Sequence, residues 1–149
     1  MRKYFAILAA LTFFAILADA DVAQARDGLY RSVAVDTSRI AWQGRVLAHN
    51  LKPLLAQEIV AAMPGRVGKS GPQLVVRVTR IKLAPVGGYD ESDYQDELSA
   101  EIFVPGRGVM PILVTLPTST GGAWYGPKFD ERRVQALIQA LAHWVARAA

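Results

Sequence analysis

The sequence predicts an α+β domain folded as a two-layer sandwich, with a mainly antiparallel sheet of about four strands and two helices on one face. Three observations support this fold class. Three segments carry the alternating or β-branched pattern of a strand, a fourth follows as a hairpin partner, and two longer segments carry apolar residues at helical spacing. Pro-Gly and Gly-rich stretches separate several of these segments. The predicted order is β-α-β-β-β-α, in a single domain over residues 26–149.

The first two elements lie between residues 30 and 63. Residues 30–36 (YRSVAVD) alternate around Val33 and Val35 and are predicted as the first strand, and residues 37–44 are a connector that holds Trp42. Residues 46–63 then have helical periodicity. The apolar stripe of this helix consists of Leu47, Leu51, Leu54, Leu55, Ile59 and Ala62.

Pro53 interrupts this first helix. Proline is tolerated in the first turn of a helix but kinks an interior turn, because it lacks the N–H that the preceding turn would bind. Either the helix begins near Asn50, which then acts as the N-cap, or a longer helix bends at Pro53. Pro64 and Gly65 end the helix in both cases.

Residues 73–83 (QLVVRVTRIKL) are rich in β-branched residues and form the second predicted strand. The apolar positions change face part-way along it. Those up to Val78 lie on one face, whereas Ile81 and Leu83 lie on the other. A β-bulge near Thr79 and Arg80 would return all of them to one face, and this is the preferred interpretation. The alternative is a strand buried on both sides at different points.

A hairpin follows the loop at residues 84–95. Residues 96–104 (DELSAEIFV) alternate, which places Glu97, Ser99 and Glu101 outward. Residues 105–108 (PGRG) form a turn, and residues 109–116 return as the antiparallel partner. The inward positions of the first hairpin strand are Leu98, Ala100, Ile102 and Val104.

The last predicted element is a helix over residues 130–148, which follows a Gly-rich loop at residues 117–127. Asp130 is a candidate N-cap, and Arg147 suits the negative end of the helix dipole. The apolar stripe of this helix consists of Val134, Leu137, Ile138, Leu141, Val145 and Ala148.

An acidic segment at residues 87–97 (GGYDESDYQDE) is the first candidate binding site. Its five carboxylates belong to Asp90, Glu91, Asp93, Asp96 and Glu97. Oxygen-rich loops can bind Ca²⁺, but the spacing of an EF-hand is absent. We therefore expect an exposed docking patch and no metal site. Aromatic residues are common in the cores of interfaces, and the candidate binding residues are Tyr89, Asp90, Asp93 and Tyr94.

The second candidate binding site is the Gly/Trp loop, residues 118–127 (TSTGGAWYGP). Gly121 and Gly122 allow positive φ, and Trp124 and Tyr125 place two large amphipathic rings on the same loop. One interpretation is a recognition loop for protein, glycan or lipid. The other is that Trp124 plugs the end of the sandwich while the glycines shape the turn.

No motif in the sequence predicts catalysis. Residues 65–70 (GRVGKS) resemble a phosphate-binding loop, but Met63 stands where the motif needs Gly, and a predicted helix precedes the segment instead of a strand. The two histidines, His49 and His143, lie on separate predicted helices. We expect no catalytic residue and no cofactor. A hydrolase that uses dispersed carboxylates is retained as an alternative.

The amino terminus is typical of a cleavable secretory signal peptide at residues 1–25. Arg2 and Lys3 are followed by an uncharged apolar run at residues 4–18, and residues 23–25 (AQA) suit signal peptidase, with cleavage after Ala25. The run is shorter than the roughly 20 residues of a transmembrane helix, although an uncleaved anchor is the alternative. The chain has no Cys, which excludes a lipid-bearing cysteine and disulfides. We expect a periplasmic or secreted protein without a stable membrane anchor.

The chain has a net charge of +4, and its arginines are scattered along the sequence. No basic run interleaved with aromatic residues occurs, so nucleic-acid binding is not expected, and the basic residues are interpreted as a solvated surface.

The export signal, the strand–helix–strand opening at residues 32–83 and the terminal helix together resemble small envelope accessory domains of bacteria. The pattern is similar to the amino-terminal domain of the Tol-system translocation protein. The resemblance implies a non-enzymatic accessory module whose partner is an envelope protein. A binder of small ligands or glycans that uses the Gly/Trp loop is the alternative.

Overall fold

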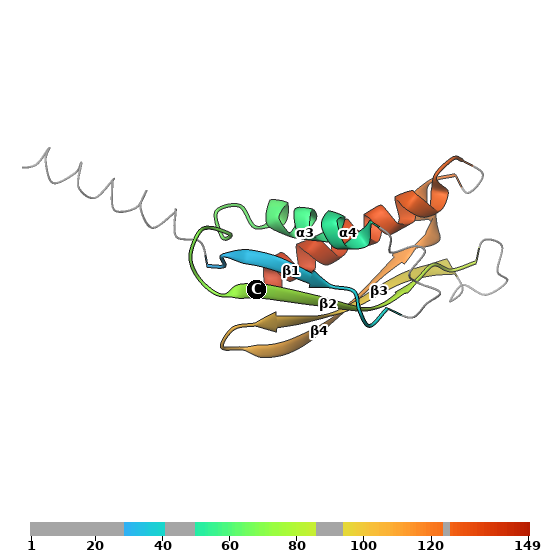
Figure 1. Ribbon diagram of the computed structural model, residues 1–149. Helices are drawn as coiled ribbons and strands as arrows, with labels where there is room; N and C mark the ends of the chain where they lie inside the picture. Colours follow the sequence, from blue (N-terminus) through green and yellow to red (C-terminus); the bar gives the residue numbers. More distant parts are fainter. Residues whose placement is uncertain (1–28, 41–49, 86–93, 124–125) are drawn as a thin grey trace, which may run out of the picture.

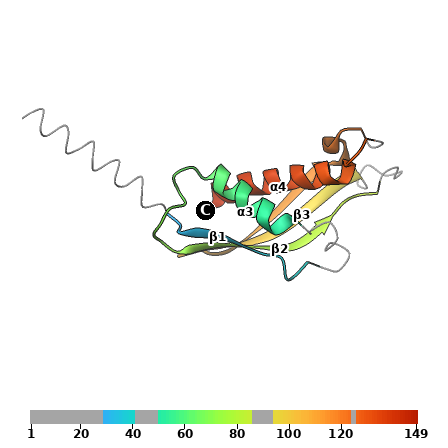
Figure 2. The same cartoon turned by 45° about the horizontal axis from the view of Figure 1, so that its top comes forward.

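The structure is a computed structural model, and it describes residues 29–40, 50–85, 94–123 and 126–149. It confirms the predicted fold class and the order β-α-β-β-β-α. Four strands form one sheet, and both helices pack on the same face of it (Figures 1 and 2). The other face of the sheet is not covered by either helix (Figure 2).

The strands follow one another across the sheet in the order of the sequence. They are β1 (Ser32–Asp36), β2 (Gln73–Lys82), β3 (Gln95–Val104) and β4 (Gly108–Pro117). β1 is parallel to β2 because helix α3 (Leu51–Ala62) connects the two strands, whereas the other pairs are antiparallel. The sheet is therefore mixed, with one parallel pair.

The bulge predicted in β2 is confirmed. The register between β2 and β3 shifts between Val78 and Arg80, so that Thr79 and Arg80 together stand opposite Ser99. As a result, Ile81 is buried on the same face as Val78. The two residues are three positions apart, a spacing that would place them on opposite faces of a regular strand.

The core lies between the inner face of the sheet and the two helices. β3 supplies a strictly alternating row of buried side chains, as predicted. The helices close the core with side chains of full burial, which are Leu51, Leu55 and Ile59 from α3 and Leu137, Ile138, Leu141 and Val145 from α4 (Phe129–Ala148).

Helix α3 begins directly after Asn50, with Pro53 in its first turn. Asn50 occupies the cap position, but its side chain makes no capping hydrogen bond; instead, its carbonyl oxygen accepts a bond from the N–H of Leu54. The prediction that Leu54 belongs to the apolar stripe is wrong, because 36% of this residue is exposed. The adjacent Leu55, which was predicted in the same stripe, is fully buried.

Helix α4 begins one residue earlier than predicted, and Asp130 is not its N-cap. Lys128 holds the cap position with φ +58°, and Asp130 lies in the first turn. The Asp130 carboxylate accepts a hydrogen bond from Arg133 at 3.0 Å.

Within the described stretches, no helix has the length and apolarity needed to cross a membrane. The signal peptide predicted at residues 1–25 lies outside the described residues.

Candidate functional site

Three strand ends and one helix start meet at one end of the sandwich. Lys82 near the end of β2 pairs with Glu97, and Gln95 at the start of β3 pairs with Pro117 at the end of β4. Helix α4 begins at the same end (Figure 1). We call this region the loop end and define it by its described residues, 83–85, 94–96, 117–123 and 126–133. Both predicted binding loops leave the sheet here.

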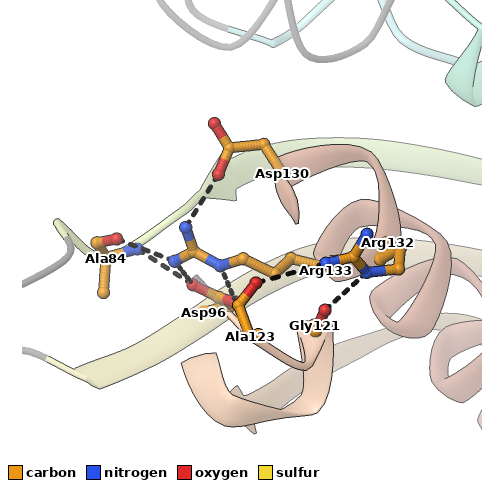
Figure 3. Close-up of polar contacts among 7 residues, drawn as sticks. All are labelled: Ala84, Asp96, Gly121, Ala123, Asp130, Arg132 and Arg133. Atoms are coloured by element: carbon orange, nitrogen blue, oxygen red, sulfur yellow. Dashed lines mark hydrogen bonds and ion pairs between the residues drawn. The ribbon is translucent and has the colours of Figure 1, made fainter. Parts of the chain in front are cut away.

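Arg133 is buried at the centre of the loop end, with 2% of its side chain exposed. Its Nε donates to Oδ2 of Asp96 at 2.7 Å, and its Nη2 donates to Oδ1 of the same carboxylate, which makes a bidentate ion pair (Figure 3). Nη2 also donates to the carbonyl oxygen of Ala84 at 2.7 Å, and Nη1 donates to Asp130. The guanidinium lies 5.0 Å from the ring centroid of Phe129.

This network ties together the two ends of the acidic loop, the connection between β2 and β3 that carries most of the acidic segment. Asp96 also accepts a hydrogen bond from the backbone N–H of Ala84 at 2.9 Å. Ala84 leads into the loop and Asp96 follows it, so one carboxylate and one guanidinium fix both ends to helix α4. Burial acts to lower the pKa of Arg133, but the bonds and charges of Asp96 and Asp130 outweigh it and raise this pKa above its ordinary value.

Arg132, the preceding residue on α4, holds the Gly/Trp loop in a similar way. Its Nε donates to the carbonyl oxygen of Gly121 at 2.6 Å, its Nη1 to that of Pro127, and its Nη2 to that of Ala123 at 3.3 Å. Figure 3 shows the two guanidinium groups on the same turn of α4, with Arg132 bonded to Gly121 and Ala123 and Arg133 bonded to Ala84, Asp96 and Asp130. Two consecutive arginines therefore position the bases of both loops.

The two glycines of the Gly/Trp loop have different roles. Gly122 has φ +79°, as the sequence predicted for this position. Gly121 does not have positive φ. A Cβ atom at Gly121 would lie 2.6 Å from Cγ of Arg133 and 3.0 Å from a ring carbon of Phe129, so glycine is needed there for space.

The predicted site residues divide into two groups. Gly121, Gly122 and Tyr94 lie at the loop end, where Gly121 is buried and 37% of Tyr94 is exposed. The remaining candidates lie outside the described residues, and they are Trp124, Tyr125, Tyr89, Asp90 and Asp93. Residues 118–121 form a short 3-10 helix instead of an irregular loop.

Two predictions about charge are wrong. Asp96 was counted among the carboxylates of an exposed docking patch, but it is only 1% exposed; its place in a strand, β3, was predicted. Arg133 was interpreted as part of a solvated surface, but it is buried because Asp96 neutralises it. The sequence does carry a signal for both. Asp96 is two residues before the inward Leu98, and Arg133 is four residues before the inward Leu137.

A second polar group lies on the uncovered face of the sheet. Arg77 on β2 forms ion pairs with Asp36 on β1 at 2.8 Å and with Glu101 on β3 at 3.7 Å, and Arg39 approaches Glu101 at 3.6 Å. The Arg77 guanidinium also stacks 4.7 Å from the ring centroid of Phe103. These contacts link three strands across the outer face.

The carboxylate of Asp36 is stabilised in its charged form. Hydrogen bonds from Ser38, including one from its backbone N–H at 2.9 Å, and then the bond from Arg77 hold the pKa of Asp36 well below its usual range.

The polar contacts at the loop end form a rigid support for the bases of the two loops. Each guanidinium at its centre is bonded to carbonyl or carboxylate oxygens of the protein itself. Among the residues that the structure describes, no group of three or more His, Asp or Glu side chains is arranged to hold a metal ion.

Comparison with known proteins adds no family to this picture. No protein-family model matches the chain, and no curated protein matches it significantly.

Proposed function

We propose that this chain is an exported, non-enzymatic binding module of the cell envelope, and that it contacts an envelope protein through the loop end. The observation that carries the proposal is the pair of adjacent arginines, Arg132 and Arg133, which fix the bases of two loops rich in aromatic and acidic residues. A recognition surface needs loops on a rigid support, and this arrangement supplies one.

Fixing the loop bases before binding reduces the entropic cost of association. Ordering a flexible loop against a partner opposes binding, and a loop that is already held avoids part of that loss. The buried ion pair of Arg133 and Asp96 is the stiffest of these supports, since a charged pair removed from water is costly to separate. The exposed ring of Tyr94 gives the loop end an aromatic contact beside the acidic loop.

The proposed compartment rests on the sequence at residues 1–25, which has the basic, apolar and small-residue regions of a secretory signal. Cell fractionation tests it directly. We expect a mature protein that begins at Arg26 in the periplasmic or secreted fraction, and a full-length protein retained in the cytoplasm would contradict the proposal.

The binding proposal is tested by quantitative capture from envelope extracts with three forms of the protein. The wild type and Trp144→Ala are expected to capture the same partner, because Trp144 is half exposed on α4 near its carboxyl end, away from the loop end. Trp124→Ala is expected to lose that partner. Equal capture by all three forms, or no partner above background with the wild type, would contradict the proposal.

A glycan or small-ligand binder is the second candidate, favoured by one observation. Arg132 holds carbonyl groups on both sides of the Trp124–Tyr125 pair, at Ala123 and Pro127, which is a suitable support for an aromatic platform. Binding of envelope glycans that is lost in Trp124→Ala, with an unchanged melting temperature, would favour this candidate. A large loss of stability would instead assign Trp124 to the core, since truncating a buried Trp costs about 3–5 kcal/mol.

A further inference from the structure

The two edges of the sheet differ in a way that the proposed loop-end function does not explain. The β1 edge is five residues long, ends on Asp36 and follows Arg31. The β4 edge is ten residues long and contains no charged side chain. Proteins usually protect a free edge with charges, prolines, bulges or short strands, because its unpaired backbone groups can add another strand. Of these devices β4 has only Pro111 and Pro117. In the sheet formed by the described residues, β4 has β3 on one side and no strand on the other.

The outer edge of β4 is also apolar. Val109 and Leu113 are 53% and 63% exposed, and both project from the face that the helices leave uncovered. On the inner face, Met110, Ile112 and Leu116 pack against the core but are only partly buried. Both faces of the strand therefore retain apolar surface that a further strand would cover.

We propose that β4 pairs antiparallel with β4 of a second copy of this chain, about a two-fold axis at Leu113. In this register Leu113 faces itself, Ile112 faces Val114 and Met110 faces Leu116 of the second copy. Cross-strand apolar pairs of this kind stabilise a sheet. The two four-stranded sheets become one continuous sheet, and the axis keeps both α4 helices on the same face of it.

The two prolines of β4 are compatible with this register. Pro111 faces Thr115 of the second copy and Pro117 faces Val109, so the positions that lack an N–H never oppose each other. Each proline still offers its carbonyl oxygen to a residue that has a donor. Prolines are tolerated in edge strands because the position of the missing N–H faces away from the neighbouring strand.

The absence of charged side chains on β4 favours a second copy of this chain over a different partner. A two-fold axis brings identical strands together, so any charge near the axis would oppose the same charge. β4 has none to oppose. The nearest acidic residues are Glu97 and Glu101 on β3, which pair with Thr115 and Pro111 of β4. Across the dimer they are three strand spacings apart, about 14 Å, which exceeds the Debye length of about 8 Å at physiological ionic strength.

The contact is small, so the dimer is expected to be weak. Edge pairing of one strand buries less surface than the roughly 1,200 Å² at which stable complexes begin. Sedimentation of the purified protein from micromolar to millimolar concentration should show a reversible monomer–dimer equilibrium.

Leu113→Lys and Val60→Lys form a matched pair of variants. Leu113→Lys places two like charges against each other at the axis and should raise the dimer Kd by about tenfold or more. Val60 is a similarly exposed aliphatic residue on α3, so Val60→Lys should leave the Kd unchanged. A monomer at every concentration, or a dimer that Leu113→Lys leaves intact, would overturn the proposal.

A cysteine variant tests the register even if the lysine variant folds poorly. The chain has no Cys, so Leu113→Cys introduces one thiol per copy. Facing Cβ atoms across an antiparallel pair are about 4.5–5.5 Å apart, which a short bismaleimide linker spans. We expect efficient cross-linked dimer from Leu113→Cys and little from Val60→Cys. Equal cross-linking of the two variants would contradict a two-fold axis at Leu113.

Discussion

At the scale of single residues, the buried pair of Arg133 and Asp96 controls the loop end. A buried charge is tolerated only when it is paired and its remaining donors are satisfied, and Arg133 meets both conditions through Asp96, Ala84 and Asp130. The pair therefore adds little net stability by itself but makes any other arrangement of the loop bases unfavourable.

The first prediction concerns this pair. Arg133→Met should destabilise the protein by about 3–5 kcal/mol, because it leaves the Asp96 carboxylate buried without a counter-charge. Urea unfolding measures the loss. The double variant Arg133→Met/Asp96→Leu should lose clearly less unfolding free energy than the two single variants lose together, because both charges are then removed. Additive losses, or a single loss below about 1 kcal/mol, would show that the pair is not buried as described.

The second prediction concerns Gly121. Gly121→Ala should cost about 1–3 kcal/mol, because its Cβ would overlap the aliphatic part of Arg133 and the ring of Phe129. Ser119→Ala in the same 3-10 helix serves as the control, since Ser119 is exposed and should change stability by less than about 0.5 kcal/mol. A neutral Gly121→Ala variant would mean that Arg133 does not pass beside this glycine.

At the scale of elements, β2 shows how one extra residue maintains the core face. The bulge makes Thr79 redundant for register, since Val78 already pairs with Ala100 and Ile81 already pairs with Leu98. Deleting Thr79 leaves Arg80 alone opposite Ser99 and keeps every inward residue inward.

The third prediction follows from this register. Deletion of Thr79 should retain the fold and cost about 0.5–1.5 kcal/mol, the worth of the hydrogen bond from its hydroxyl to the carbonyl of Ser99. Deletion of Val75 is the control. It should be far more destabilising, because it moves Leu74 from the core to the outer face. Circular dichroism and urea unfolding distinguish the two, and similar losses would contradict the role assigned to the bulge.

The fourth prediction concerns Asp36, which links β1 to β2 through Arg77. The pKa of Asp36 is depressed in the folded state, so its contribution to stability is present above its unfolded pKa of about 3.9 and is lost as the pH falls through the folded value. Asp36→Asn should therefore be less stable than the wild type at neutral pH, and the difference should narrow at acidic pH. Urea midpoints measured over a pH series check this, and a difference that does not vary with pH would contradict it.

At the scale of the whole molecule, the sequence predicted the architecture because the fold is encoded by periodicity. Alternation in β3, the helical stripe of α4 and the displaced apolar residues of β2 each indicated one buried face, and each is confirmed. These signals are local and repeated, so the substitution of one position does not obscure them.

The loop end was less predictable because it depends on single contacts between distant residues. Asp96 and Arg133 are 37 residues apart, and nothing in either neighbourhood identifies the other as its partner. Their positions on inward faces were visible in the periodicity, but a charged residue at such a position is ordinarily assigned to the surface. Arg132 could not be predicted at all, because its partners are backbone carbonyl groups that carry no sequence signal.

Site-specific photo-crosslinking in producing cells tests most directly whether the loop end contacts the partner. A photoreactive side chain is placed in turn at two exposed positions of the loop end, Tyr94 and Ala123, and at Val60 on α3 as the control. We predict the same adduct with an envelope protein from positions 94 and 123 and none from position 60. Adducts from position 60 alone, or from none of the three, would contradict this contact.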